Sequence, residues 1–332
     1  MDKSLKIRGR IIKTINPFYT KKKFDFCNRI MNRFAVGRKL CGGVDYRQEF
    51  IRREDGSLLR ICIYSPEKQK EKAIGLLWLH GGGYAIGVPE QDIPFIKSFV
   101  KNFNCVVVAP DYTRSVEKPF PAALLDCYEA LWWLRLNAAK LGVDEEKLFV
   151  GGDSAGGGLT AALTLYARDM NEVKIAFQMP LYPMIDDRET PSSENNNMPV
   201  WDTESNRLAW KLYLGDKSEN VSCYAAPARA TDFSELPPTL TYVGTLEPFR
   251  DETVKYVKNL KSAETDVFFE IFDDCYHGFD IVAPDSEPAK KAREFLMSGF
   301  SYAAEHYSAA QICDGKQRKR SIIYDEIEAE KR

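Results

Sequence analysis

The 332-residue sequence is short of the residues that build structural zinc sites. It contains only three histidines, and its eight cysteines include no Cys-x-x-Cys pair. Structural zinc takes four closely spaced Cys or His ligands, so no such site is expected. The chemistry that the motifs of this chain predict needs no metal or organic cofactor either. Cys62 and Cys105 lie in apolar runs, which is typical of buried thiols in a reducing compartment.

Long apolar runs are also absent. No stretch approaches the roughly 20 apolar residues that cross a bilayer. The first fifteen residues interrupt their apolar side chains with Lys or Arg, unlike a signal peptide. We therefore predict a cytoplasmic protein with no integral membrane segment.

The chain as a whole has no large excess of charge of either sign, but its N-terminal part is strongly basic. The formal net charge is −2, which gives no reason to expect a nucleic-acid partner. Residues 1–40, however, carry twelve Lys or Arg against only Asp2 and Asp25. The remainder of the chain is therefore net acidic.

The basic N-terminal segment also has a helical pattern. Phe26, Ile30 and Phe34 recur at four-residue spacing between basic residues, and Asn16-Pro17 breaks the pattern. The favoured interpretation is a pair of helices packed on their own domain. The alternative is a docking element for a membrane or a partner.

From residue 46 the pattern predicts an α/β fold. A hairpin at 46–64 is followed by short apolar strands that alternate with helices, which is typical of a mainly parallel sheet covered on both faces. The predicted strands are 73–79, 105–109, 148–151, 175–180, 240–243 and 267–272, and the predicted helices are 93–102, 121–141, 157–168, 206–214 and 251–262.

A Gly-x-Ser-x-Gly motif centred on Ser154 lies between a predicted strand and a predicted helix. Gly152 and Gly156 would allow a sharp turn that exposes the serine hydroxyl above the sheet. Ser154 is therefore the candidate nucleophile. The alternative is a glycine-rich turn that matches the motif by chance.

A second glycine-rich segment, His80-Gly81-Gly82-Gly83, follows another predicted strand. Its bare backbone suits an oxyanion hole, for which we nominate the N–H groups of Gly82, Gly83 and Ala155. His80 and Gly81 would support the loop. A phosphate-binding loop is the alternative, but no Gly-Lys-Ser/Thr follows.

The base must be one of three histidines. His80 belongs to the glycine loop, and His306 lies in a polar helix where a surface position is expected. His277 follows the last predicted strand, where a loop can bring its imidazole beside Ser154. His277 is therefore the candidate base.

The acid that orients His277 comes from residues 247–252. Glu247 is the first carboxylate beyond the preceding strand, and we choose it over Asp251. Asp251 and Glu252 would act as acids in the first turn of a helix. The order Ser154, Glu247, His277 is that of α/β-hydrolases.

These motifs together resemble the hormone-sensitive-lipase family of esterases, known from bacterial carboxylesterases, from about Leu77 to Phe279. The matching segments are His80–Gly83, Asp111-Tyr112, Pro119–Ala123, Gly152–Gly157, Glu247–Glu252 and Tyr276–Phe279. The resemblance implies an α/β-hydrolase fold and places the catalytic acid before Pro248, at Glu247. The family usually has aspartate there, and often arginine where this chain has Thr113.

The family also carries a helical cap, which implies a domain plan for this chain. Residues 1–42 would be N-terminal cap helices, 43–312 the catalytic domain with a cap insertion at 185–222, and 313–332 a charged tail. Tyr84, Trp201 and Trp210 are candidate substrate-binding residues. The two tryptophans have the alternative role of holding the cap together.

The expected function is hydrolysis of short-chain acyl esters, with a small-molecule ester as the binding partner. A related hydrolase acting on an amide, lactone or formamide is the first alternative, and a non-catalytic ligand receptor on the same scaffold is the second. Related esterases often pair, so the resemblance leaves a homodimer open.

Overall fold

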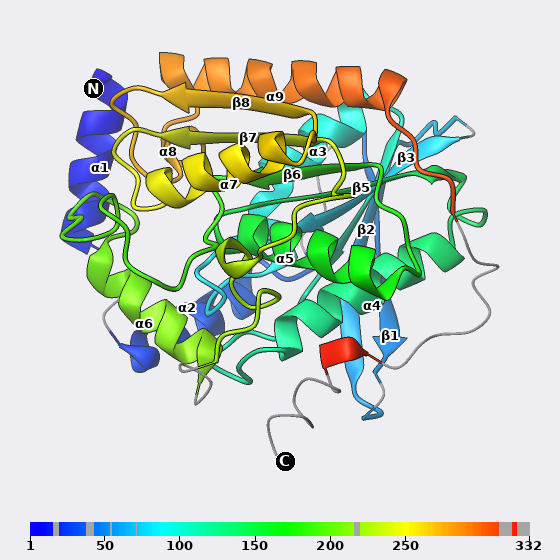
Figure 1. Cartoon of the computed structure of the whole chain (residues 1–332), viewed down its shortest axis with the longest axis horizontal. Helices are drawn as coiled ribbons and strands as arrows, with labels where there is room; N and C mark the ends of the chain where they lie inside the picture. Colours follow the sequence, from blue (N-terminus) through cyan, green and yellow to red (C-terminus); the bar gives the residue numbers. More distant parts are fainter. Residues whose placement is uncertain are drawn as a thin grey trace.

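An eight-stranded sheet forms the centre of the structure (Figure 1). The computed structural model describes residues 1–15, 20–37, 43–53, 55–70, 72–215, 220–311 and 321–323. The strand order is β1-β2-β4-β3-β5-β6-β7-β8; β1–β2 and β2–β4 are antiparallel and the other pairs are parallel. The strands are β1 (Asp45–Arg52), β2 (Leu58–Ser65), β3 (Ala73–Leu79), β4 (Cys105–Pro110), β5 (Val143–Asp153), β6 (Phe177–Leu181), β7 (Thr239–Gly244) and β8 (Val267–Phe272).

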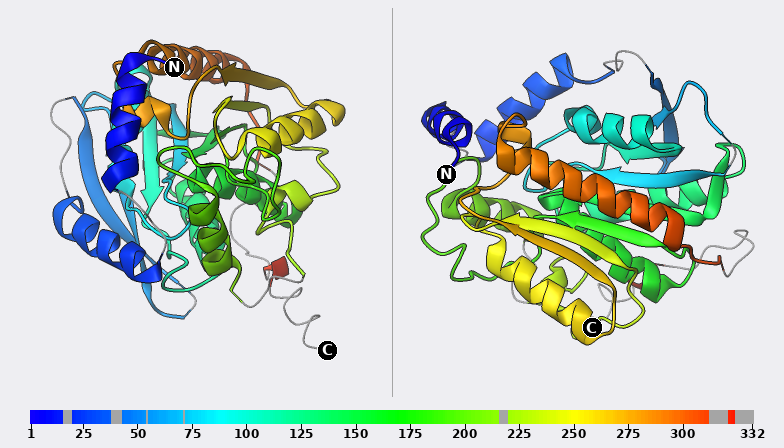
Figure 2. Two further views of the ribbon diagram at one scale, coloured as in Figure 1. Left: turned by 90° about the vertical axis from the view of Figure 1, so that its left-hand side faces the viewer. Right: turned by 90° about the horizontal axis from the view of Figure 1, so that it is seen from above.

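Helices cover both faces of this sheet, as Figure 2 shows from the side and from above. Residues of α4, α5 and α7 join one buried apolar cluster, and residues of α3 and α9 join another. The helices are α1 (Lys3–Ile15), α2 (Lys21–Phe34), α3 (Ile93–Asn102), α4 (Ala122–Leu136), α5 (Ala155–Met170), α6 (Thr203–Leu214), α7 (Arg250–Ser262), α8 (Phe279–Val282) and α9 (Glu287–His306).

Strand β3 shows why the sequence forms this layered core. All seven of its residues are buried. Leu77 and Leu79 join the cluster with α4 and α5, whereas Leu76 and Trp78 join the cluster with α3. Because successive side chains of a strand point to opposite faces, a strand covered on both sides needs a continuous apolar run.

The predicted α/β fold is confirmed, and the predicted element at 121–141 is partly wrong. Helix α4 ends at Leu136, not at residue 141. Ala138 and Leu141 are buried in the turn that follows, so the apolar pattern continues after the helix has ended. Strand β5 begins at Val143, five residues earlier than predicted.

The N-terminal helices pack on the rest of the chain, as the favoured interpretation expected, but not through the residues that marked the helical pattern. Phe26, Ile30 and Phe34 are exposed, and α2 instead buries Phe24 and Asn28. The predicted break at Asn16-Pro17 lies outside the described residues, as does all of the predicted 313–332 tail except residues 321–323.

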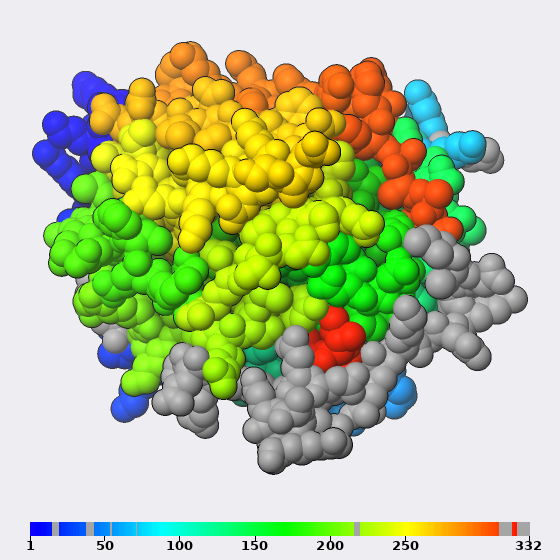
Figure 3. Space-filling view, viewed as in Figure 1, coloured from blue at the N-terminus to red at the C-terminus, as the bar shows by residue number. Residues whose placement is uncertain are grey.

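The 185–222 segment meets the N-terminal helices at one end of the sheet. It carries α6, and the Nζ of Lys13 in α1 donates a hydrogen bond to the carbonyl oxygen of Asn197. In the space-filling view (Figure 3), atoms of α7 form part of the surface in front of the sheet, and atoms of α6 lie at the lower left. Within the described residues, no helix has both the length and the apolarity needed to span a bilayer.

Candidate functional site

Ser154 occupies a strained turn between β5 and α5. Its backbone has φ 56° and ψ −119°, a combination that costs free energy for a residue with a side chain. Three hydrogen bonds hold it: the Ser154 N–H donates to the Leu181 oxygen at 3.0 Å, and the Ser154 oxygen accepts from the N–H groups of Gly158 at 2.9 Å and Met184 at 3.1 Å. The surrounding backbone therefore fixes the position of the hydroxyl.

The glycines around Ser154 are required by close backbone contacts. A Cβ on Gly152 or on Gly156 would overlap the carbonyl oxygen of Leu79. A Cβ on Gly156 would also lie 2.6 Å from the oxygen of His80. The two glycines therefore let the turn pass against the end of β3 and the start of the His80–Gly83 loop.

A continuous series of hydrogen bonds joins Ser154, His277 and Glu247. The Oγ of Ser154 lies 2.8 Å from the Nε2 of His277, and the Nδ1 of His277 lies 2.8 Å from the Oε2 of Glu247. The other Glu247 oxygen, Oε1, accepts from the Gly244 N–H at 3.0 Å. A carboxylate only accepts, so Nδ1 carries the imidazole hydrogen and Nε2 is left to accept from the serine hydroxyl.

Of the three neighbouring acids, only Glu247 reaches the histidine. The Oδ2 of Asp251 accepts instead from the Ser192 N–H at 2.9 Å. The Oε1 of Glu252 accepts from the backbone N–H of Ile185 at 2.7 Å. The structure thus gives Asp251 and Glu252 loop-anchoring contacts.

The side chain of His277 is buried and lies against aromatic rings. Ser154, Glu247 and His277 are all buried. Burial raises the pKa of Glu247, while the charge and hydrogen bond of His277 act in the opposite direction. The rings of Phe249 and Tyr182 meet the imidazole edge to face, at centroid distances of 5.0 and 5.2 Å. They restrict its rotation and exclude water from its faces.

The glycine loop presents unused backbone donors. Gly82 and Gly83 have φ values of 118° and 57°, which favour glycine. Across the described ranges, their N–H groups donate to no other protein atom. Ala155 is the first residue of α5, where the N–H has no partner within the helix. These three N–H groups are the candidate oxyanion donors.

His80 and Gly81 hold this loop from behind. The Nδ1–H of His80 donates to the oxygen of Gly81 at 2.8 Å, and the imidazole stacks on Tyr112 at a centroid distance of 4.1 Å. Burial lowers the pKa of His80 to about 4, so the ring is neutral at pH 7. His306, by contrast, is exposed and contacts the oxygen of Tyr302.

The three candidate pocket residues have different surroundings. Tyr84 is buried, donates to the oxygen of Met184 at 2.6 Å, and stacks on Tyr213 at 3.9 Å. Trp201 lies against Gly83 and donates to the Oδ1 of Asn206 at 3.4 Å. The buried Nε1 of Trp210 has no partner among the described residues.

Two buried carboxyl groups behind Ser154 were missed by the sequence analysis. The carboxyl groups of Asp153 and Asp92 interact with each other, and the Trp78 indole donates to the Oδ2 of Asp92 at 2.9 Å. The Oδ2 of Asp153 would lie 2.5 Å from a Cβ on Gly81. Burial raises the pKa of both acids, that of Asp92 to about 6. They link the nucleophile turn to the glycine loop, and no motif marks Asp92.

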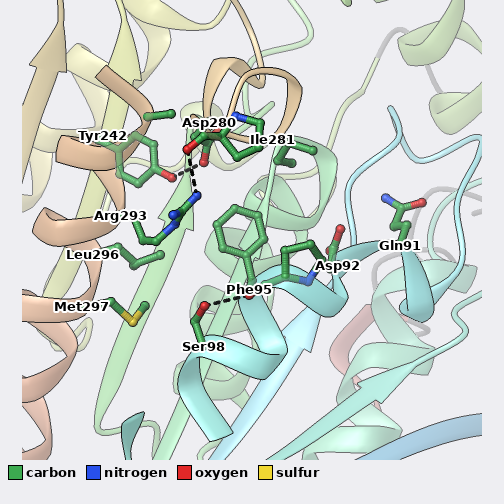
Figure 4. A pocket seen from close by; sticks show the side chains of 13 residues that line it. Gln91, Asp92, Phe95, Ser98, Tyr242, Asp280, Ile281, Arg293, Leu296 and Met297 are labelled. Carbon is green, nitrogen blue, oxygen red and sulfur yellow. Dashed lines mark hydrogen bonds between the residues drawn. The ribbon is translucent and has the colours of Figure 1, made fainter. Parts of the chain in front are cut away.

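A separate cavity of about 100 Å³ lies between α3, α8 and α9 (Figure 4). Asp280, three residues after His277, lies on its wall and accepts a 2.6 Å hydrogen bond from the Tyr242 hydroxyl. Ser154 and His277 do not line this cavity. It is therefore distinct from the space above the serine.

Thr113, where the resembled family often has arginine, takes part in an ion-paired cluster. Its hydroxyl donates to the Oδ2 of Asp126 at 2.7 Å. The guanidinium of Arg53 binds both oxygens of the same carboxylate, at 2.5 and 2.9 Å. Arg53, the residue that follows β1, therefore neutralises the buried carboxylate of Asp126.

Comparisons with known proteins identify the fold and the family of the chain. The family model described as the alpha/beta hydrolase fold matches residues 76–281. An arylesterase of Saccharolobus solfataricus is 31% identical over 254 residues, which cover 73% of this chain and 79% of the arylesterase. The carboxylesterase NlhH of Mycobacterium tuberculosis is 32% identical over 240 residues, which cover 69% of this chain and 74% of that enzyme.

A solved structure is also similar along nearly the whole chain. A bacterial heroin esterase superposes with a TM-score of 0.84 and 31% identity, and the match covers 91% of this chain and 98% of the esterase. The chain therefore belongs to the alpha/beta hydrolase fold family and, within it, to the carboxylesterases of the hormone-sensitive-lipase type.

Proposed function

We propose that the protein hydrolyses short-chain acyl esters, with Ser154 as nucleophile, His277 as base and Glu247 as the acid that orients the base. The observation that carries this proposal is the series of two 2.8 Å contacts from Glu247 through His277 to Ser154. The names of its relatives, an arylesterase and a carboxylesterase, support an ester as the substrate.

In the first half of the reaction, the Ser154 Oγ attacks the ester carbonyl carbon while His277 Nε2 takes its proton. Negative charge then develops on the former carbonyl oxygen, where the N–H groups of Gly82, Gly83 and Ala155 can donate to it. His277 next gives the proton to the departing alcohol, and the acyl group remains on Ser154.

In the second half, water replaces the alcohol. His277 takes a proton from the water as its oxygen attacks the acyl carbon, and the same N–H groups stabilise the second oxyanion. The proton returns to Ser154 as the acid leaves. Glu247 stays ionised throughout and stabilises the imidazolium that forms twice in each cycle.

A cap built from residues 1–42 and 185–222 is also proposed. Its support is that each part contacts a loop of the site. The Tyr276 hydroxyl, next to His277, donates to the Leu5 oxygen in α1 at 2.9 Å. Trp201 of the insertion lies on Gly83. The ring restricts the space beside the glycine loop, which supports a short acyl group.

A chain-length series of p-nitrophenyl esters from acetate to decanoate, with matched p-nitroanilides, tests this function. We expect the largest kcat/KM for the short acyl esters and far lower values for the anilides. A preference for decanoate would contradict the short-chain assignment. Faster turnover of amides, lactones or formamides would indicate the related hydrolase, and binding without turnover would indicate a receptor.

A further inference from the structure

The two N-terminal helices present apolar side chains to solvent. Ile7 and Ile11 of α1 are 49% and 53% exposed, and Phe26, Ile30 and Phe34 of α2 are 58%, 43% and 57% exposed. In each helix these residues are four apart, which places them on one stripe of that helix. We call these five residues the N-terminal apolar face.

The outward orientation of α1 is fixed by contacts on its opposite side. Leu5 is completely buried, and its carbonyl oxygen accepts from the Tyr276 hydroxyl at 2.9 Å. Arg8 forms a 2.6 Å ion pair with Asp285. A Cβ on Gly9 would lie 2.9 Å from the Tyr276 ring, so this side of the helix is packed closely. The exposed stripe therefore does not reflect a detached helix.

Helix α2 is held in the same way. Phe24 is completely buried. The side chain of Asn28 donates to the oxygen of Ala85 at 2.9 Å and accepts from the Gly87 N–H at 3.2 Å. Phe26 and Ile30 therefore face solvent because the inner face of the helix is already occupied.

Basic side chains border the apolar stripe on both helices. At about 100° per residue, Arg29 and Arg33 lie within one turn of Phe26 and Ile30 on the exposed side. The Arg33 guanidinium lies 5.9 Å from the centre of the Phe34 ring. The exposed cations of the two helices are Lys3, Lys6, Arg10, Lys13, Lys21, Lys22, Lys23, Arg29 and Arg33. Apolar residues bordered by cations are typical of helices that lie in a lipid interface.

The charge distribution favours an anionic partner at this face alone. Residues 1–40 carry twelve Lys or Arg and two acids, whereas the whole chain carries −2. The rest of the molecule is therefore net acidic and would be repelled by an anionic surface. A second copy is disfavoured as the partner, because a two-fold interface would place the same cations opposite one another.

We propose that the N-terminal apolar face docks on an anionic lipid surface. The five apolar side chains would enter the acyl-chain boundary while the bordering cations contact the headgroups. Figure 2 shows α1 and α2 along the side of the molecule that the left-hand view turns toward the reader. Binding to the surface does not depend on the reaction at Ser154.

The two helices also contact loops of the candidate site. Helix α1 binds Tyr276, the neighbour of His277, and α2 binds Ala85, two residues after Gly83. Docking through these helices would therefore bring the lipid surface close to both loops. An ester dissolved in the lipid would then be concentrated near Ser154.

Co-sedimentation of the full chain with vesicles tests the proposal. One vesicle set contains equal parts of phosphatidylglycerol and phosphatidylcholine, and the other contains phosphatidylcholine alone. We expect binding to the mixed vesicles at least about tenfold tighter than to phosphatidylcholine, and weakened by high salt. No binding to the mixed vesicles, or equal binding to both sets, would overturn the proposal.

Two variants separate the apolar contribution from the charge contribution. Phe26→Ser/Ile30→Ser/Phe34→Ser and Arg29→Gln/Arg33→Gln should each weaken binding by about tenfold or more. Their matched controls remove exposed residues elsewhere: Leu136→Ser/Ile271→Ser and Lys290→Gln/Lys291→Gln. The controls should bind like the parent chain.

Circular dichroism and thermal melting identify variants that fold like the parent, and only those are compared. If the serine variant fails to fold, the arginine pair alone decides the result. Equal loss of binding in a variant and its control would overturn the proposal. So would a change of oligomeric state in the folded apolar variant without a change in vesicle binding, because a second copy would then cover this face.

Discussion

The indole ring of Trp201 lies directly on the Cα of Gly83, and a Cβ at that glycine would overlap the Cη2 atom of the ring. This contact joins the 185–222 segment to the loop that carries the candidate oxyanion donors. Gly83 also has a φ of 57°, which disfavours a side chain independently of the tryptophan.

Gly83→Ala should therefore reduce kcat by on the order of 10²–10³, because the loop must shift and displace one oxyanion donor. Gly56→Ala is the matched control, since Gly56 has a φ of 83° but open space around its Cα. It should reduce stability by about 1 kcal/mol and leave kcat near the parent value. Equal rates for the two variants on p-nitrophenyl acetate would contradict the role of Gly83.

The two acids near His277 should differ in their effect on catalysis. Glu247→Gln keeps the shape of the side chain but removes the charge that stabilises the imidazolium, so kcat should fall by on the order of 10³–10⁴. Asp251→Asn should change kcat only a few-fold, because the Oδ2 of Asp251 contacts the Ser192 N–H instead. A larger loss in a folded Asp251 variant would transfer the acid role to that residue.

His80 should make the protein less stable in acid. Its folded-state pKa of about 4 lies below the usual 6.5. Its contribution to stability is therefore present above about pH 6.5 and is lost as pH falls through about 4. In His80→Asn, the Asn Nδ2 can replace the hydrogen-bonding Nδ1–H without titrating.

Urea unfolding at a series of pH values tests this prediction. Between about pH 7 and pH 4, the parent should lose on the order of 1–3 kcal/mol more unfolding free energy than His80→Asn. Parallel pH dependence in the two proteins would show that the folded state does not resist protonation of His80.

Asp92 should make the protein less stable as pH rises, which is the opposite of the effect of His80. Its folded-state pKa of about 6 lies above the usual 3.8. Its contribution to stability is therefore present below about pH 4 and is lost as pH rises through about 6. Asp92→Asn removes this titration, and the Asn oxygen can still accept from Trp78.

The same unfolding measurement applies to Asp92→Asn at about pH 4 and about pH 8. The unfolding free energy of the variant, relative to that of the parent, should rise by on the order of 1–3 kcal/mol between about pH 4 and about pH 8. A constant difference between the two proteins would mean that Asp92 titrates normally in the folded chain.

The sequence was most informative where one local pattern dictates one structure. The run at 73–79 formed a strand with these bounds because both of its faces are buried. The glycines at 152 and 156 indicated a tight turn, and the backbone of Leu79 occupies the space that their side chains would need. Of the chosen residues, His277 lies within hydrogen-bonding distance of both Ser154 and Glu247.

The sequence was least informative where tertiary contacts choose between equivalent patterns. Periodicity identified α2 as amphipathic but could not show which apolar stripe faces inward, and the buried side chain is Phe24 instead of Phe26. In the sequence, Asp92 looks like any acid at the start of a helix. Only the fold brings its carboxyl group to that of Asp153. The contact of Trp201 with Gly83 joins segments more than a hundred residues apart, beyond the reach of local patterns.

Turnover of p-nitrophenyl acetate by Ser154→Ala tests the central claim most directly. Because the acyl group is proposed to pass through the Ser154 hydroxyl, kcat should fall by on the order of 10⁶ while the thermal melting curve stays close to that of the parent. A folded Ser154→Ala protein that retains kcat within about tenfold of the parent would contradict the account.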